Sequence, residues 1–78
     1  MANGREGKIA RLTGREREVA ALVCNGLSNK IVAQKLNVSE GTIKIHLHTI
    51  FQKLRVRGRS ELAVALFGII NVYSAKLQ

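Results

Sequence analysis

The sequence predicts an all-α protein, a four-helix bundle with a central helix-turn-helix. Three observations lead to this prediction. Apolar residues recur at the three- and four-residue spacing of helices from about residue 13 to about residue 70. A capping residue precedes each of the four apolar stretches. No segment shows the sustained alternation of apolar and polar residues that is typical of β-strands.

The length of the chain indicates one small domain, and its charge favours a polyanionic partner. The chain has 78 residues, of which 46% are hydrophobic, enough for a thin core. Lysine and arginine together number 13 against 5 acidic residues, all glutamate, so the formal net charge is +8. A surplus of positive charge on a folded domain favours binding to a polyanion, although charge alone does not name it.

Composition also excludes several classes of protein. The absence of aspartate excludes an aspartyl phosphoacceptor, an aspartic dyad and an EF-hand loop, and a single cysteine excludes disulfide scaffolds and cysteine zinc sites. No apolar run reaches the length of a membrane span, and the first residues lack the apolar core of a signal peptide. We therefore expect a cytoplasmic protein with no membrane association, no cofactor, no bound metal and no small-molecule ligand in this domain.

The chain divides into three parts. Residues 1–11 have scattered charge and no sustained period, and we expect a linker or a disordered N-terminal segment there. Residues 12–70 form the predicted domain, and residues 71–78 are either a C-terminal tail or an extension of the last helix.

The first two helices have clear boundary signals. Thr13 and Glu16 have the spacing of a capping box at the start of the first helix, and Gly26 is placed to end it in a left-handed turn. Ser28 is the expected N-cap of a second helix over about 29–36. A turn of about three residues then separates this helix from the next, which is typical of a helix-turn-helix.

The third and fourth helices follow the same logic. Ser39 caps a third helix over about 40–55, with Glu40 in its first turn, where the helix dipole favours negative charge. Either Gly58 or Ser60 opens a fourth helix over about 59–70, and this helix is apolar nearly all round. A helix that is apolar on all sides must bury both of its faces. A domain this small can cover only one of them, so the other face of this helix is expected to contact a partner.

The third helix has one apolar face and one mainly polar face. At 100° per residue its core stripe comprises Ile43, Leu47, Ile50 and Leu54. The exposed side carries Lys44, Ile45 and His48, with Ile45 nearly opposite the core. Such a set supplies hydrogen-bond donors for guanine and an apolar contact for a thymine methyl group. Thr42, Lys30 and Lys53 lie where they are expected to reach phosphates. The alternative is that this is merely the solvated face of a surface helix.

Other candidate chemical groups are better explained structurally. Cys24 is expected to be a buried free thiol. His46 and His48 are two positions apart on a helix and therefore make a poor metal pair. Ser28 and Ser39 stand at helix caps, a role far more common than catalysis, and the chain has no aspartate for a Ser-His-Asp triad. An enzyme is therefore not expected.

From Leu12 to Leu66 the sequence resembles the LuxR-type, or GerE-like, helix-turn-helix domain, which is the DNA-binding output domain of the NarL/FixJ response regulators. The matching positions are Leu12-Thr13, Arg15-Glu16-Arg17-Glu18-Val19, Gly26, Ser28-Asn29-Lys30, Ala33, Leu36, Val38-Ser39, Thr42-Ile43-Lys44, His46, Ile50, Lys53-Leu54, Val56 and Arg59. So many positions in order are a specific signal. The resemblance implies a four-helix domain that binds duplex DNA in the major groove, usually as a dimer, to regulate transcription.

The resemblance also implies roles for individual residues. Lys44, Ile45 and His48 match positions that face the bases of the groove. Positions near the DNA backbone match Lys30, Ser39, Thr42 and His46, and together with Asn29 and Lys53 these form our expected set of backbone contacts. Relatives often dimerise through the fourth helix, so Val64, Phe67 and Gly68 are the expected dimer interface.

Two positions depart from the family pattern. Ile31 stands where relatives usually carry glutamate, so the second helix is expected to lack one half of a capping box. Ile31 is expected to pack either inward or against a partner domain. Gly58 stands where relatives often have serine, a small loss at an N-cap.

The expected function is sequence-specific binding of double-stranded DNA by a bacterial transcriptional regulator of a two-component system. A homodimer on DNA is expected, with RNA polymerase as a candidate further partner. We expect the chain to be part of a longer regulator rather than a stand-alone one. Two other functions stay open: a helix-turn-helix-like protein-interaction module that has lost DNA binding, and a basic amphipathic segment on anionic membranes.

Overall fold

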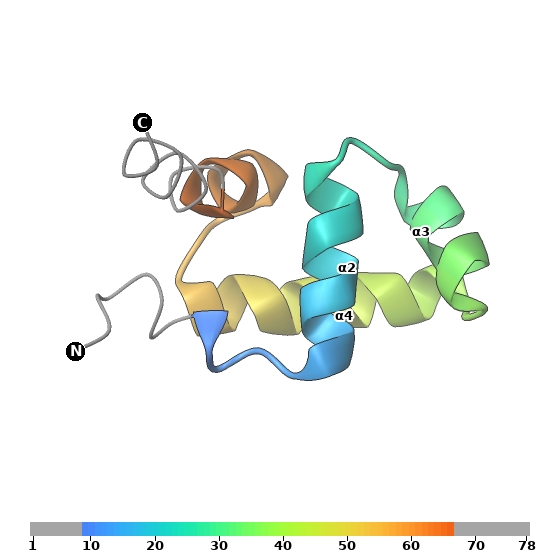
Figure 1. Ribbon diagram of the computed structural model, residues 1–78, viewed down its shortest axis with the longest axis horizontal. Coiled ribbons are helices and arrows are strands. Elements are labelled where there is room, and N and C mark those ends of the chain that lie inside the picture. Colours follow the sequence, from blue (N-terminus) through green and yellow to red (C-terminus); the bar gives the residue numbers. More distant parts are fainter. Residues whose placement is uncertain (1–8, 67–78) are drawn as a thin grey trace, which may run out of the picture.

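The computed structural model describes residues 9–66. Within this range it contains helices α2 (Gly14–Cys24), α3 (Asn29–Leu36) and α4 (Glu40–Leu54), a further helix over 59–66, and no strand (Figure 1). The all-α prediction is confirmed. The second helix has the predicted bounds, and the third ends one residue earlier than predicted. The expected linker at 1–11 and the expected continuation of the fourth helix to residue 70 lie largely outside the described residues, as does the tail at 71–78.

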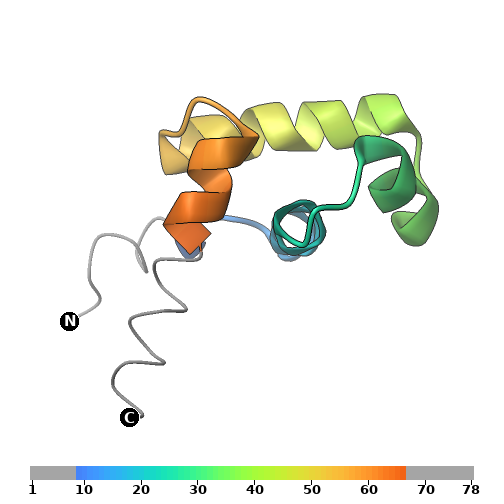
Figure 2. The same cartoon turned by 90° about the horizontal axis from the view of Figure 1, so that it is seen from above.

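All the shorter helices pack on one side of α4. In Figure 1, α2 lies across the middle of α4, and α3 lies beside its N-terminal half. The helix over 59–66 lies at the other end of α4. Figure 2 shows α4 above the other three helices, which all lie beneath it. The opposite side of α4 is therefore left uncovered by the described part of the chain.

The core is formed by one apolar stripe from each helix. Its buried members are Leu12, Val19, Ala20, Val23, Val32, Ala33, Ile43, Leu47, Ile50, Leu54 and Leu62. The four predicted core residues of α4 are all among them. Leu22 and Leu36 pack against this core but are only partly buried.

Side chains that cap the helices set where α2, α3 and α4 begin. The α2 capping box is complete, because Thr13 Oγ1 accepts from Glu16 N at 3.1 Å while Glu16 Oε1 accepts from Thr13 N at 2.8 Å. Ser28 caps α3 from one side only, accepting from Ile31 N at 3.2 Å. Ile31 is 38% exposed, so it does not pack inward.

Left-handed residues end the same helices. Gly26, which follows α2, has a φ of 85°, as the sequence predicted. Asn37 and Arg55 adopt φ values of 58° and 56° after α3 and α4. Asparagine is often found in this conformation, and it makes the tight turn of the helix-turn-helix possible. The left-handed backbone at Arg55 marks the end of α4 after Leu54.

Gly58 opens the last helix, because Leu62 N donates to Gly58 O at 3.0 Å. Glycine supplies no capping oxygen, and Glu61 reaches back instead to accept from the backbone N–H of Arg57 at 3.2 Å. Leu62 is fully buried and joins this helix to the core. Of the two predicted openings, Gly58 and Ser60, the structure has the first.

Candidate nucleic-acid interface

The uncovered side of α4 carries the predicted base-reading residues. Ile43 and Ile50 are fully buried on one side, whereas Ile45 is 69% exposed on the other. Lys44 and His48 are exposed on the same open side as Ile45. The structure thus brings these three residues together on one solvent-facing surface, which we call the open face of α4. A large exposed apolar residue beside two nitrogen donors is a pattern suited to groove recognition.

The N-terminus of α4 is held by two hydroxyl groups. Ser39 Oγ accepts from the backbone N–H of Thr42 at 3.1 Å and lies 3.0 Å from Thr42 Oγ1. Both residues were predicted as DNA backbone contacts on the basis of sequence. Their mutual hydrogen bond fixes the first turn of α4, from which the open face projects.

Asn29, another predicted backbone contact, is tied to the last helix. Arg59 Nη1 donates to Asn29 Oδ1 at 2.6 Å, and Arg59 Nη2 donates to the carbonyl oxygen of Leu27 at 2.7 Å. The two bonds form a fork, which we call the Arg59 fork, that joins the start of the last helix to the first residue of α3 and to the loop before it. Arg59 was noted in the sequence as a matching family position but was not predicted to belong to the site.

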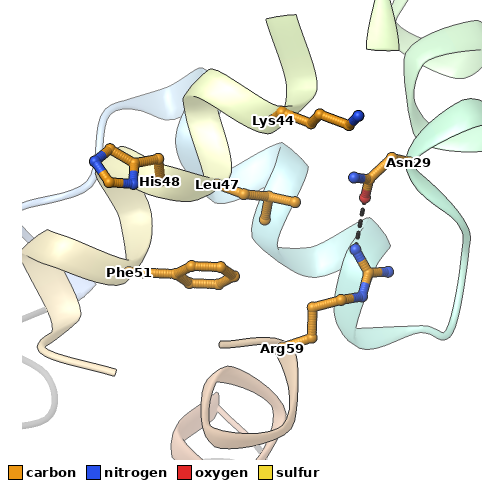
Figure 3. Close-up of a pocket in the computed structure, with 6 residues that line it drawn as sticks. All are labelled: Asn29, Lys44, Leu47, His48, Phe51 and Arg59. Atoms are coloured by element: carbon orange, nitrogen blue, oxygen red, sulfur yellow. Dashed lines mark hydrogen bonds between the residues drawn. The ribbon is translucent and has the colours of Figure 1, made fainter. Parts of the chain in front are cut away.

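The Arg59 fork borders an open hollow of about 300 Å³ beside the open face. Figure 3 shows its lining, with Leu47 and Phe51 as an apolar floor and polar side chains around it. The lining residues are Asn29, Lys44, Leu47, His48, Phe51 and Arg59. Lys44 and Arg59 contribute two positive charges to this lining, and none of the six residues carries a carboxylate.

Lys53 has an internal partner. Its Nζ donates to Glu16 Oε1 at 2.7 Å, in an ion pair whose carboxylate side chain is 8% exposed and whose lysine side chain is 32% exposed. The hydrogen bond from Lys53 holds the pKa of the Glu16 carboxyl below its usual range, although burial acts in the opposite direction. Lys53 thus joins α4 to α2, a role that the sequence did not predict.

The remaining predicted residues are more dispersed. Lys30 is exposed on α3, and His46 is half-buried on the flank of α4 away from the hollow. Val64 is 71% exposed on the last helix. Phe67 and Gly68, the other two predicted interface residues, lie outside the described residues.

Other chemistry is limited in this part of the chain. Cys24 is half-buried rather than fully buried, because it lies in the last turn of α2 at the edge of the core. Burial raises the pKa of the Cys24 thiol, despite the nearby Arg59 guanidinium. Within residues 9–66, histidine, cysteine and glutamate side chains do not gather in groups of three that could hold a metal ion. The described helices also lack the length and apolar character needed to span a bilayer.

Comparison with known proteins gives a consistent result. Residues 10–66 match the family profile described as bacterial regulatory proteins, luxR family. The chain is 37% identical over 59 residues to the nitrate/nitrite response regulator protein NarL of Escherichia coli K12, covering 76% of this chain and 27% of NarL. It is 49% identical over 53 residues to the transcriptional regulatory protein LnrK of Bacillus subtilis 168, covering 68% of this chain and 24% of LnrK.

A solved structure agrees with the fold. The response regulator StyR has a TM-score of 0.78 and 41% sequence identity, with 82% of this chain and 32% of StyR covered. The chain therefore spans about a quarter to a third of the length of these three relatives.

Proposed function

The chain belongs to the luxR family of bacterial regulatory proteins, and from this premise we propose that it binds double-stranded DNA sequence-specifically as the output domain of a cytoplasmic response regulator. Its relatives are transcriptional regulators rather than enzymes. We propose that α4 enters the major groove, which is about 12 Å wide and admits one helix. The observation that carries the proposal is the exposure of Ile45 on the open face, next to Lys44 and His48.

The chemistry of the open face supports base reading. The Lys44 ammonium and an imidazole N–H of His48 are donors suited to the O6 and N7 acceptors of guanine. Ile45 is suited to a thymine methyl group. Keeping so much of its apolar surface in water is unfavourable, and contact with DNA would remove that surface from water.

The flanks of α4 support the backbone contacts. Asn29 of α3 borders the hollow on one flank of the open face, and Lys30 is the exposed residue next to it in the sequence. At 100° per residue, Thr42 and His46 lie on the other flank of α4. A helix in a groove has one phosphate strand on each side, so each flank is placed to meet one strand. Ser39 and Lys53 belong to the proposed set, but Lys53 must share its ammonium with Glu16.

We also propose that the domain dimerises on DNA through the last helix, with Val64, Phe67 and Gly68 in the interface. The support is the 71% exposure of Val64 on a helix whose sequence is apolar nearly all round. Two copies would read two half-sites separated by about one helical turn of DNA. RNA polymerase is a further proposed partner of the assembled regulator.

The proposal is tested first by in vitro selection of bound sequences from a random duplex library. The protein is then titrated against the selected and scrambled duplexes at several salt concentrations. We expect a defined motif with two related half-sites and affinity that falls steeply with salt, with a log–log slope of about −0.9 for each phosphate neutralised. A chain that shifts no duplex even at low salt would contradict the proposal and favour the protein-interaction module.

A further inference from the structure

We propose, resting on the function proposed above, that the hollow beside α4 seats one phosphate of the DNA backbone and that Arg59 is a DNA contact residue supplied from outside the helix-turn-helix. The hollow lies at the rim of the open face, where Lys44 and His48 form part of its wall. A groove-bound α4 would place one phosphate strand along this rim. The anion's chemical class is therefore a phosphodiester of the same duplex that α4 reads.

The donor arrangement of the hollow carries the proposal. Because Arg59 Nη1 donates to Asn29 Oδ1 at 2.6 Å, the carboxamide of Asn29 is oriented with its Nδ2 donor group away from the guanidinium. Figure 3 shows this nitrogen on the side of Asn29 that faces Lys44, whose side chain extends toward it. The Nδ2 donor group of Asn29 is thus not used by Arg59 and lies at the edge of the hollow nearest Lys44, whose own ammonium is assigned to base reading.

Arg59 retains donors for an anion. The guanidinium has five N–H groups, and the fork to Asn29 and Leu27 uses two of them. The side chain is already held in one geometry, so less conformational entropy is lost when an anion binds. The hollow measures about 300 Å³, roughly ten times the volume of one liquid water at about 30 Å³ each, so a phosphate group with some of its hydration fits.

Two substitutions separate an anion site from a structural clamp. Asn29→Asp keeps an oxygen acceptor for Arg59 and puts negative charge in the first turn of α3, which stabilises a helix. It replaces the Nδ2 donor with an acceptor that repels phosphate. We expect an unchanged or higher melting temperature and an affinity for DNA at least about tenfold weaker, equally on selected and scrambled duplexes.

Arg59→Ala removes the cation itself. We expect at least about a tenfold loss of affinity on every duplex and a salt slope smaller by about 0.9, because one fewer phosphate is neutralised. Arg17→Ala removes the same charge from the exposed surface of α2 and is the matched control, expected to bind with nearly wild-type affinity.

Ethylation interference identifies the phosphate directly. For the wild-type protein, ethylation of the flanking phosphates in each half-site should block binding. For Arg59→Ala, one of these phosphates per half-site should become insensitive. If Arg59→Ala keeps the wild-type interference pattern, or if Asn29→Asp binds as tightly as the wild type, the phosphate seat is wrong although the protein binds DNA. If the wild type binds no duplex, the proposed function itself fails.

Discussion

Lys53 in the last turn of α4 donates to Glu16 in the first turn of α2 across 2.7 Å, although 37 positions separate them in the sequence. The same Glu16 oxygen accepts from the backbone N–H of Thr13. One carboxylate thus completes the cap of α2 and anchors the far end of the proposed recognition helix. The orientation of α4 relative to the rest of the core depends in part on this single group.

We expect Lys53→Met to destabilise the fold by about 1–2 kcal/mol. The substitution leaves a buried carboxylate without its charged partner, although the partial exposure of Lys53 moderates the cost. Urea unfolding at neutral pH measures the effect. Lys35→Met, at an exposed lysine of α3, should change stability by less than about 0.5 kcal/mol. Equal stability of the two variants would show that the ion pair contributes nothing.

The lowered pKa of Glu16 predicts an acid-sensitive fold. A carboxyl whose pKa is lower in the folded than in the unfolded state contributes stability that is fully present above its unfolded value near 4.5. That contribution is lost as the pH falls through the lower, folded-state pKa. Urea midpoints measured from pH 7 down to pH 3 should therefore decline less for Glu16→Gln than for the wild type. Glu18→Gln, at an exposed carboxylate of the same helix, is the control. Parallel pH profiles for the wild type and Glu16→Gln would contradict the prediction.

Ile31→Glu should stabilise α3 by about 0.5–1 kcal/mol. The cap of α3 is one-sided, and a glutamate at the third helical position can accept from the backbone N–H of Ser28, as Glu16 does for Thr13. Ile31 is 38% exposed, so little apolar burial is lost. Thermal unfolding should place Ile31→Glu above the wild type and Ile31→Lys at or below it. If Ile31→Glu is no more stable than Ile31→Lys, the glutamate does not accept from the backbone N–H of Ser28 and the capping box is not completed.

Two lysines on neighbouring helices should have different effects on DNA binding. Lys44→Ala, on the open face, should cost about 1–3 kcal/mol and relax specificity at one base pair. Lys30→Ala, at a proposed contact to the DNA backbone, should weaken binding to all duplexes alike and reduce the salt slope by about 0.9. Titration against a set of single-base-pair variants of the selected duplex distinguishes the two patterns. If Lys44→Ala weakens binding to every duplex equally, Lys44 does not read a base.

Val64→Glu should weaken dimerisation and cooperative binding to two half-sites. The side chain is 71% exposed in the single chain, so the charge is tolerated by the monomer fold but not in an apolar interface. Sedimentation equilibrium over a wide range of concentrations compares its mass with that of the wild type. Gln34→Glu supplies the same change of one negative charge at an exposed position on α3. If the wild-type protein keeps the mass of a monomer at high concentration, the proposed dimer interface is contradicted.

The sequence determined the helices and the faces that they present. Thr13, Ser28 and Ser39 start helices because their hydroxyl groups accept from a backbone N–H three residues ahead, an interaction contained within one turn. The buried stripe of α4 and the exposure of Ile45 follow in the same way from a period of 3.6 residues. Features that repeat within a turn can be read from neighbouring residues, and this is why the open face could be predicted in advance.

Only the tertiary structure decided which distant residues meet. The pairing of Lys53 with Glu16 and of Arg59 with Asn29 depends on the angles at which the helices cross and on where α2 and the last helix come to rest. No local periodicity encodes those angles, since they result from side chains packing between whole helices. For this reason the sequence predicted Lys53 as a phosphate contact without its internal partner. For the same reason it could place Arg59 within the family pattern without revealing the hollow that Arg59 borders.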